Sequence, residues 1–285
     1  MPEKVLLNTG PSARGAHRIQ LALTCAALYA FQRVVQHPAA LGDRGPLVRG
    51  SIGHAGLAHH YARLGCVQRG TDPDVFYTPH AAIDLVADSF APMGNQFRKL
   101  NHDAYDAYGR FYAVERHFIE GVECLVDVQV PTPDGPIRFT QRWDLVTKDD
   151  AGRLWIHDHK FVAKIEAKTV MRYALSIQFT SMVWLAHHIL KERFGGVKLN
   201  LIGVGSERTA FQRVTVPPAP DAVRRFPATL AAAERRIAAI EALASPWDAE
   251  RVYSEQVCMT PYGPCSAMEL CRWGQGHLTA DGRTL

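Results

Sequence analysis

The sequence lacks the features of a membrane or secreted protein. No run of about 18 apolar residues occurs along the 285 residues, so we expect no membrane-spanning helix and no membrane partner. The first fifteen residues, MPEKVLLNTGPSARG, contain no hydrophobic core of a signal peptide. We therefore expect a cytoplasmic protein. In that reducing compartment the six cysteines indicate metal, cluster or catalytic roles rather than disulfides.

The sequence also has little excess charge, no internal repeat and no low-complexity tract. Its 32 Lys and Arg against 28 Asp and Glu give a formal net charge of +4, which is compatible with nucleic acid but does not indicate it. Hydrophobic residues make up 47% and charged residues 21%, as is ordinary for a globular protein. Because no flexible linker divides the chain, we expect a single domain over residues 1–285.

Hydrophobic periodicity predicts a chain of mixed α/β class. In chain order the predicted elements are helices at 17–36, 51–64, 81–90 and 96–107, strands at 110–118, 124–130, 137–146 and 154–161, a helix at 168–194, a strand at 197–206 and a helix at 222–243. Gly65 is the predicted end of the second helix. This order predicts a central sheet built on an antiparallel meander and flanked by helices, with a helical N-terminal segment and a cysteine-bearing C-terminal segment.

The chemistry of the chain is concentrated in residues 141–160, QRWDLVTKDDAGRLWIHDHK. Two strand-like runs flank a turn rich in Asp and Gly, which predicts a β-hairpin. With the turn near Ala151, Asp144 lies opposite Asp158, and facing Cβ atoms on paired strands are ~5 Å apart. Lys160 is two residues beyond Asp158 and therefore shares its face.

Two facing carboxylates repel each other, and a divalent cation between them removes that repulsion. Mg²⁺ and Mn²⁺ prefer such oxygen ligands, and a metal beside a lysine suits phosphodiester hydrolysis. The lysine would orient the attacking water or stabilise charge on the phosphate. The competing interpretation is that these charges lie near a turn and are simply solvated.

One face of the predicted helix at 168–194 is apolar except at one position. The residues on that face are Met171, Leu175, Gln178, Met182, Leu185 and Ile189. A buried amide must find hydrogen-bond partners or destabilise the fold by ~1–3 kcal/mol. Gln178 is therefore either a core residue bonded to backbone or a residue directed at the polar site of the hairpin.

Three cysteines lie close together near the C-terminus, in VCMTPYGPCSAMELC. Cys258, Cys265 and Cys271 surround Pro and Gly turns, and thiolates favour Fe–S clusters or Zn²⁺. Either centre normally needs a fourth ligand, for which we favour Cys25 over Cys66 and Cys124. A centre shared by Cys25 and Cys258 would close a loop of more than two hundred residues and contribute ~5 kcal/mol as a structural crosslink. The alternative is three unrelated buried thiols.

Together these motifs resemble the PD-(D/E)XK nuclease superfamily, and within it the RecB-like branch that carries an iron–sulfur cluster. That branch includes the CRISPR-associated adaptation exonuclease, the AddB nuclease domain and phage exonucleases. GSIGHAGLAHHY matches the histidine motif with His54, QRWDLV matches the Asp strand with Asp144, and DHK matches the D/E-x-K strand. The family's Q-x-x-x-Y helix has Gln178 here, with Met182 in the place of the tyrosine. The resemblance covers residues from about 17 to 273.

The resemblance implies a restriction-endonuclease-like fold and a set of site residues. His54, Asp144 and Asp158 would hold Mg²⁺ or Mn²⁺, helped by the backbone carbonyl of His159. Lys160 would position or activate water, and Gln178 would brace the lysine or the water. Four further residues are candidates for supporting roles. Glu115 would either lie near the metal or be a solvated or structural glutamate. Lys164, Lys168 and Arg172 would contact DNA.

The resemblance also implies a 4Fe-4S cluster bound by Cys25, Cys258, Cys265 and Cys271, within segments 17–37 and 250–276. Structural Zn²⁺ is the alternative. RIQLALTCAALYAF resembles the family's first cysteine segment, with Ala26 where proline is usual, and TPYGPCSAMELC resembles its C-terminal one. A crosslink of this kind would join the chain ends and take no part in catalysis.

The function expected from these features is a Mg²⁺- or Mn²⁺-dependent deoxyribonuclease, an exonuclease rather than an endonuclease. Its substrate would be single-stranded DNA or duplex ends, in recombination, repair or phage DNA processing, beside a helicase or recombination partner. The alternative, from another class, is a non-catalytic DNA-binding or assembly subunit of a larger complex. Substitution of Lys160 separates the two, because only the enzyme would lose an activity.

Overall fold

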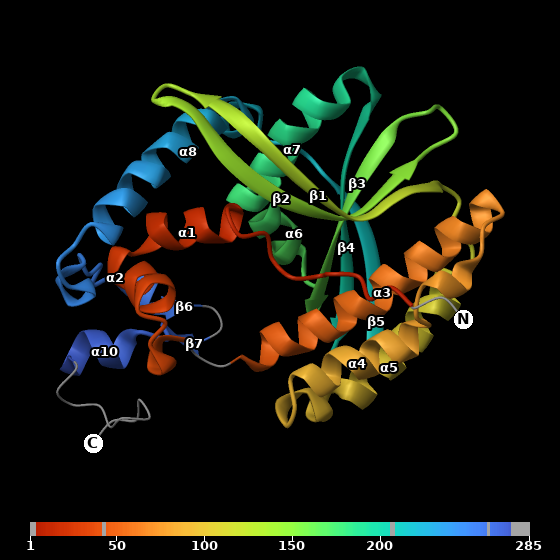
Figure 1. Ribbon diagram of the computed structural model, residues 1–285, viewed down its shortest axis with the longest axis horizontal. Helices are drawn as coiled ribbons and strands as arrows, with labels where there is room; N and C mark the ends of the chain where they lie inside the picture. The colour runs from red at the N-terminus through yellow and green to blue at the C-terminus, as the bar shows by residue number, and fades with distance from the viewer. Residues whose placement is uncertain (1–3, 42–43, 206–208, 261–262, 275–285) are drawn as a thin grey trace. The chain divides into compact units, whose positions relative to one another are not determined.

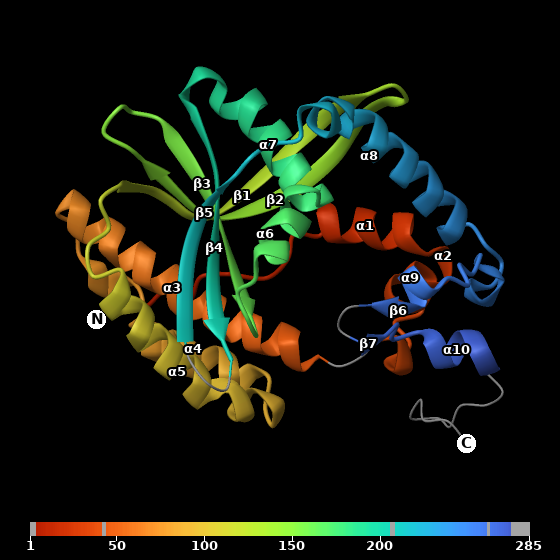
Figure 2. The same ribbon diagram turned by 180° about the vertical axis from the view of Figure 1, so that it is seen from behind.

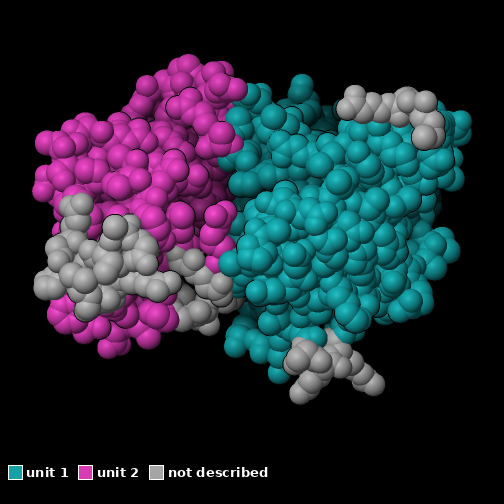
Figure 3. All heavy atoms as spheres, turned by 60° about the horizontal axis from the view of Figure 1, so that its bottom comes forward, with its two compact units in different colours: residues 1–12, 45–127, 140–224 teal, residues 13–44, 128–139, 225–285 magenta. Residues whose placement is uncertain are grey.

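The computed structural model describes residues 4–41, 44–205, 209–260 and 263–274. They form two compact units, coloured separately in Figure 3: the first unit comprises residues 1–12, 45–127 and 140–224, and the second unit comprises residues 13–44, 128–139 and 225–285. Ser206 of the predicted strand, Pro261 and Tyr262 of the cysteine motif, and positions 275–276 lie outside the described residues. Within those residues, the structure contains no helix with the length and apolar character needed to cross a membrane.

A five-stranded sheet is the centre of the first unit (Figure 1). Its strands, in the spatial order β1-β2-β3-β4-β5, are β1 (Phe118–Thr132), β2 (Gly135–Lys148), β3 (Leu154–Val162), β4 (Phe194–Val204) and β5 (Thr209–Val216). Strands β2 and β3 pair antiparallel, β3 and β4 pair parallel, and β4 and β5 pair antiparallel. This mixed sheet with flanking helices confirms the predicted fold class. The sequence pattern did not predict β5.

Three helices of the first unit pack together beside the sheet. They are α3 (Gly45–Arg69), α4 (Pro79–Ser89) and α5 (Met93–Phe111), with a short 3-10 turn, Pro73–Val75, after α3. Leu57 and Tyr61 of α3 join Ile202 of β4 in one apolar cluster. The predicted end of α3 at Gly65 is wrong. The helix continues because its buried face extends beyond this residue, and it ends before Gly70, whose φ of +67° is a conformation that suits glycine.

The predicted strand at 110–118 is also wrong, because α5 extends to Phe111 and β1 begins only at Phe118. Aromatic residues of the last turns of α5 pack into the core instead of forming a strand. Tyr108 is 1% exposed, and its ring centroid lies 4.8 Å from that of Tyr112 and 5.4 Å from that of Phe211. The predicted strands at 124–130, 137–146 and 154–161 correspond to parts of β1, β2 and β3.

The predicted helix at 168–194 is two helices, α6 (Ala167–Ala174) and α7 (Ile177–Leu190), followed by a 3-10 turn, Lys191–Arg193 (Figure 2). The break divides the expected apolar face. Met171 and Leu175 are 64% and 75% exposed, whereas Met182 and Leu185 of α7 are fully buried. The apolar face therefore belongs to α7 alone.

The second unit joins segments from both ends of the chain. It contains α1 (Ala16–Thr24), α2 (Ala26–Tyr29), a π-turn (Ala30–Val34), 3-10 turns at Pro38–Leu41 and Pro246–Asp248, most of α8 (Pro220–Glu241), α9 (Glu255–Cys258), β6 (Met259–Thr260), β7 (Gly263–Pro264) and α10 (Met268–Trp273). Leu21, Ile237 and Leu270 share its core. The single helix predicted at 17–36 is interrupted at Cys25, which has an extended backbone (φ −159°, ψ 125°).

Candidate metal and active site

The candidate site lies where β2 and β3 separate. Their antiparallel ladder ends with Leu145 opposite His157, and Asp144 and Asp158 are the next residues of the same register. Because the ladder stops there, the backbone N–H of His159 donates to the carboxylate of Asp144 instead, at 2.7 Å to Oδ2. The hairpin thus brings together the two acidic residues that the sequence pattern predicted to face each other.

Asp158 is almost completely buried, with a side chain 1% exposed, and both of its oxygens face a polar partner. The amide of Gln178 on α7 donates to Oδ1 at 2.7 Å. The ammonium of Lys160 lies 2.7 Å from Oδ2, an ion pair without the angles of a good hydrogen bond. Gln178 is therefore directed at the hairpin, and Met182, one turn further along α7, is buried in the core.

His54 approaches the carboxylates from the middle of α3, because this helix begins at Gly45 and not at residue 51 as predicted. Its Nδ1 lies 3.6 Å from Oδ2 of Asp144, too far for a hydrogen bond. Burial, helped by the charge of Lys160, lowers the pKa of His54 to about 4, so the ring is neutral at pH 7. Gly53 allows this close approach, because a Cβ there would lie 2.3 Å from the ring of Phe161 on β3.

Glu123 of β1 completes this group, and the sequence reasoning missed it. Its φ of +51° lies in the left-handed region, which is rare for a residue other than glycine. Ile119 and Val122 of β1 pack in the apolar cluster with Leu57 and Tyr61, whereas Glu123 is buried beside Asp144. The signal in the sequence is weak: an acidic residue within a short apolar run, V-E-C-L-V, of a strand that also carries Glu120 and Asp127.

One ligand atom each from His54, Glu123 and Asp144 lies within 4.8 Å of the others. Oxygens bound at ~2.1 Å in octahedral geometry are ~3.0 Å apart when adjacent and ~4.2 Å apart when opposite. Oε2 of Glu123 is buried without a hydrogen bond, and the guanidinium Nε of Arg142 is 4.0 Å away. Neutral imidazole and carboxylates are suitable ligands for Mn²⁺ and Mg²⁺. This set therefore fits a divalent cation.

The electrostatics of the carboxyl groups point the same way. Burial raises the pKa of Asp144 and of Asp158 to about 6, although Lys160 opposes the shift in both. Burial and then the charge of Asp144 raise the pKa of Glu123 to about 9. Burial lowers the pKa of Lys160, but Asp158 and Asp144 outweigh that effect and leave it raised. The acidic residues are thus held where a cation would relieve their unfavourable ionisation.

His159 projects from the opposite face of β3. Its ring stacks on Tyr61 of α3, with centroids 5.7 Å apart and planes at 14°. Its Nδ1 lies 2.9 Å from the amide nitrogen of Asn200 on β4. Because the side chain is turned away, His159 presents its backbone, and not its ring, to the carboxylate face; the metal contact of its carbonyl that the resemblance implies stays a prediction.

Glu115 does not lie with the carboxylates of the site. It forms an ion pair with Arg213, with Nη1 and Oε2 2.6 Å apart, so it has the structural role left open in the sequence analysis. The nearby strand carboxylate at the site is Glu123. Lys164, Lys168 and Arg172 are exposed on the loop after β3 and on α6, and Lys168 pairs with Glu166 at 2.9 Å.

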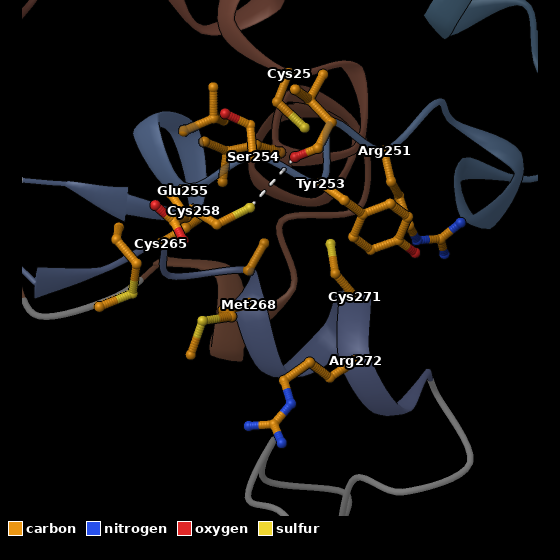
Figure 4. Close-up of a pocket in the computed structure, with 15 residues that line it drawn as sticks. Cys25, Arg251, Tyr253, Ser254, Glu255, Cys258, Cys265, Met268, Cys271 and Arg272 are labelled. Carbon is orange, nitrogen blue, oxygen red and sulfur yellow. Dashed lines mark hydrogen bonds between the residues drawn. The ribbon is translucent and has the colours of Figure 1, made fainter.

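The second unit contains a cavity of about 340 Å³ lined by Cys25, Cys258, Cys265 and Cys271. Figure 4 shows the sulfur atoms of Cys25, Cys258 and Cys271 facing the same space. The break between α1 and α2 places Cys25 at this cavity, because its residue is extended rather than helical. Burial, and then the neighbouring thiols, raise the pKa of Cys271. Cys66 and Cys124 belong to the first unit and do not line the cavity.

The spacing of these thiols differs from that of a compact tetrahedral site. Four thiolates at ~2.3 Å from one zinc ion would be ~3.8 Å apart. Among the residues that the structure describes, no three cysteine sulfurs lie within 4.8 Å of one another. The cavity is also about ten times the ~30 Å³ share of one water molecule. The four cysteines therefore line one space, but their described sulfurs are not packed as a single tetrahedral zinc site.

The mixed sheet and the split hairpin, with the D-x-K residues beside a candidate cation site, are the features of a nuclease-type α/β fold. A family model described as the PD-(D/E)XK nuclease superfamily matches residues 16–272, and the chain belongs to this superfamily. Membership implies a hydrolase that uses divalent metal and acts on DNA. No curated protein matches the chain. A solved structure titled "Crystal structure of SSO0001" is 14% identical, covering 59% of this chain and 69% of that one, with a TM-score of 0.32.

Proposed function

We propose that this protein is a Mg²⁺- or Mn²⁺-dependent DNA exonuclease whose active site is the split between β2 and β3. The observation that carries the proposal is the meeting of His54, Glu123 and Asp144 beside the Asp158–Lys160 pair. The metal ligands would be His54, Asp144 and Asp158, with Glu123 added from the geometry. The backbone carbonyl of His159 would complete the set.

A divalent ion held by these residues would polarise the phosphodiester and lower the pKa of a water molecule. The protein's own groups would orient the reactants. Gln178 holds one oxygen of Asp158, and the N–H of His159 holds one oxygen of Asp144, so both carboxylates have fixed directions. Lys160, with a side chain 20% exposed, would present its ammonium to the attacking water or to the charge that develops on the phosphate.

The DNA would approach along α6 and the loop before it. Lys164, Lys168 and Arg172 are exposed there and follow Lys160 closely in the chain. Contacts from these residues to phosphates would make affinity fall steeply with salt. We infer a preference for single strands or duplex ends from the resemblance to the RecB-like branch. That resemblance also supports a role in recombination, repair or phage DNA processing, with a helicase or recombination partner.

The direct test uses end-labelled single- and double-stranded DNA, with Mn²⁺, Mg²⁺ or EDTA, and protein purified without oxygen. We expect metal-dependent cutting that starts from an end and that Lys160→Ala abolishes while DNA binding persists. Lys99→Ala is the matched control, because Lys99 is 86% exposed and pairs only with Asp103 on its own helix. If well-folded wild-type protein binds DNA but does not cut it, the alternative of a non-catalytic binding or assembly subunit replaces this proposal.

We further propose that Cys25, Cys258, Cys265 and Cys271 bind a 4Fe-4S cluster. The size of the cavity and the spacing of the thiols support a cluster over Zn²⁺. Thiolate ligands require reduced cysteines, which agrees with a cytoplasmic location. The cluster would join segments 17–37 and 250–276, which both belong to the second unit. We propose one nuclease domain over residues 1–285 because the family model matches residues 16–272, which fall in both units.

Anaerobically purified protein should show an absorbance band near ~400 nm that is lost in Cys271→Ser. Cys66→Ser is the matched control, since Cys66 is buried in the first unit and should leave the band unchanged. If the protein is colourless and contains stoichiometric zinc, the cysteines bind structural Zn²⁺ and the cluster proposal is wrong. Such a result would leave the nuclease proposal untouched, because the four cysteines belong to the second unit and the carboxylates of the site to the first.

A further inference from the structure

The break between α6 and α7 brings an aromatic residue, Tyr173, to Lys160. The ring centroid of Tyr173, near the end of α6, lies 5.7 Å from Nζ of Lys160. At this distance the face of the ring attracts an ammonium group. Lys160 is thereby held between Oδ2 of Asp158 on one side and the ring of Tyr173 on another.

The break has a local cause in Ser176. Its hydroxyl accepts from the backbone N–H of Phe179 at 3.3 Å and so caps α7 at its first turn. Its own backbone N–H and hydroxyl both donate to the carbonyl of Tyr173, at 2.9 Å and 2.8 Å. These bonds end α6 and start α7 within two residues.

The break decides which side chains reach the site. In an unbroken helix, residues five apart such as Tyr173 and Gln178 point ~140° away from each other. Across the break both converge on the same pair, with Gln178 bonded to Asp158 and Tyr173 beside Lys160. Phe179, which is 2% exposed, lies 5.8 Å from the ring of Tyr173 between centroids and supports it from the core.

We propose that Tyr173 is a positioning residue that holds the ammonium of Lys160 in its reactive direction through the face of its ring. This inference rests on the proposed nuclease function. A lysine side chain is flexible, and a negatively charged substrate would otherwise draw the ammonium away from Asp158. The ring limits that movement. The effect through Lys160 belongs to the chemical step. The ring of Tyr173 also lies 5.7 Å from the guanidinium of Arg172, so a change in KM alone would report on Arg172 instead.

The test compares Tyr173→Leu, which removes the ring, with Tyr173→Phe, which keeps it. A cation–π contact of this type corresponds to roughly a 3- to 30-fold change in rate. We expect Tyr173→Leu to lower kcat by that factor with KM and Mn²⁺ affinity within twofold of wild type. Tyr173→Phe should restore kcat to within twofold. Tyr77→Leu is the matched control, since Tyr77 is half-buried beside Lys4 at 6.0 Å and away from the hairpin.

Three results would overturn the proposal: an unchanged kcat in Tyr173→Leu, an equal loss in Tyr173→Phe, or a loss confined to KM or metal affinity. A second measurement does not depend on cleavage. Reductive methylation of Lys160, followed by mass spectrometry, should be roughly threefold faster or more in Tyr173→Leu than in wild type, Tyr173→Phe or Tyr77→Leu. Equal labelling rates would refute the shielding by the ring. If wild-type protein fails to cut DNA, the proposed nuclease function is refuted. The labelling rates still decide whether the ring of Tyr173 shields Lys160.

Discussion

The contact of α3 with the sheet at Gly53 leaves no room for a side chain, and Gly53→Ala tests this. A Cβ at this position would lie 2.3 Å from two ring carbons of Phe161 and 2.8 Å from Oδ1 of Asn101. Real Cβ atoms do not come that close to other atoms, so α3 or Phe161 must move. His54 is the next residue, and its Nδ1 is already 3.6 Å from Asp144.

The magnitude follows from two opposing effects. Alanine is favoured over glycine inside a helix by about 1 kcal/mol. Overpacking a tight contact costs about 1–3 kcal/mol. Gly50 lies on the same helix, and a Cβ there would meet nothing within 4 Å. Gly50→Ala therefore includes the helix preference alone, so the difference between the two variants, about 1–3 kcal/mol, reports the clash at Phe161.

The assay is urea unfolding of both variants and of wild type, with the metal-dependent cleavage rate measured in parallel. We expect Gly50→Ala to be as stable as wild type or more stable, and Gly53→Ala to be less stable than Gly50→Ala. Displacement of His54 should also lower the cleavage rate of Gly53→Ala, since misplacing a catalytic group by ~1 Å can reduce rates about 100-fold. Phe161→Leu should partly restore both properties in the double variant.

Equal stability of Gly53→Ala and Gly50→Ala would refute the reasoning, because the clash would then be absent. An equal loss of stability from Gly53→Ala in the presence and absence of Phe161→Leu would also refute it. In that case the ring of Phe161 is not the obstacle.

Three further predictions concern other groups of the first unit. Glu123→Gln should weaken Mn²⁺ binding roughly tenfold or more in calorimetric titration. It should not destabilise the metal-free protein at pH 7, because a pKa of about 9 already leaves Glu123 protonated. An unchanged Mn²⁺ affinity would remove Glu123 from the ligand set. Burial, with the charge of Arg63, lowers the pKa of His59 to about 4, below its unfolded value of ~6.5. Between pH 6.5 and 4 the unfolded state therefore binds one more proton than the folded state, and about 3 kcal/mol of stability should be lost as the pH falls through that window. Urea unfolding at pH 4.5 and 7 should show a smaller loss of stability in His59→Gln than in wild type. An identical loss in both proteins would contradict this prediction. Arg213→Met should destabilise the fold by about 3–5 kcal/mol, because it leaves Glu115 buried without its partner. Adding Glu115→Leu should recover part of this loss. If the double variant recovers no stability, the broken ion pair is not the cause.

Local patterns in the sequence predicted the parts of the site that depend on neighbouring residues. A turn near Ala151 and the two-residue period of strands together place Asp144 across from Asp158 and set Lys160 on the same face. Gln178 was singled out as the one strongly polar residue on an apolar helix face, and it bonds Asp158. The cysteine spacing likewise brought together residues that line one cavity.

Only the tertiary structure decided features that depend on distant contacts. The left-handed backbone of Glu123 turns its carboxylate toward His54, and no short-range pattern signals such a backbone. The sequence left Glu115 with either a place near the metal or a structural role, and the structure pairs it with Arg213, almost a hundred residues later in the chain.

The two helix breaks have the same explanation. The residues around Cys25 and Leu175 have good helical patterns, yet the chain departs from the helix at both. One break directs a thiol into the cavity of the second unit, and the other turns Tyr173 and Gln178 toward the same ion pair. Helix propensity differs by less than about 1 kcal/mol per residue between ordinary side chains, so packing and capping decide where helices end. Local sequence patterns therefore predicted candidate residues such as Asp144, Asp158 and Gln178, and the tertiary contacts determined which of them meet and added Glu123.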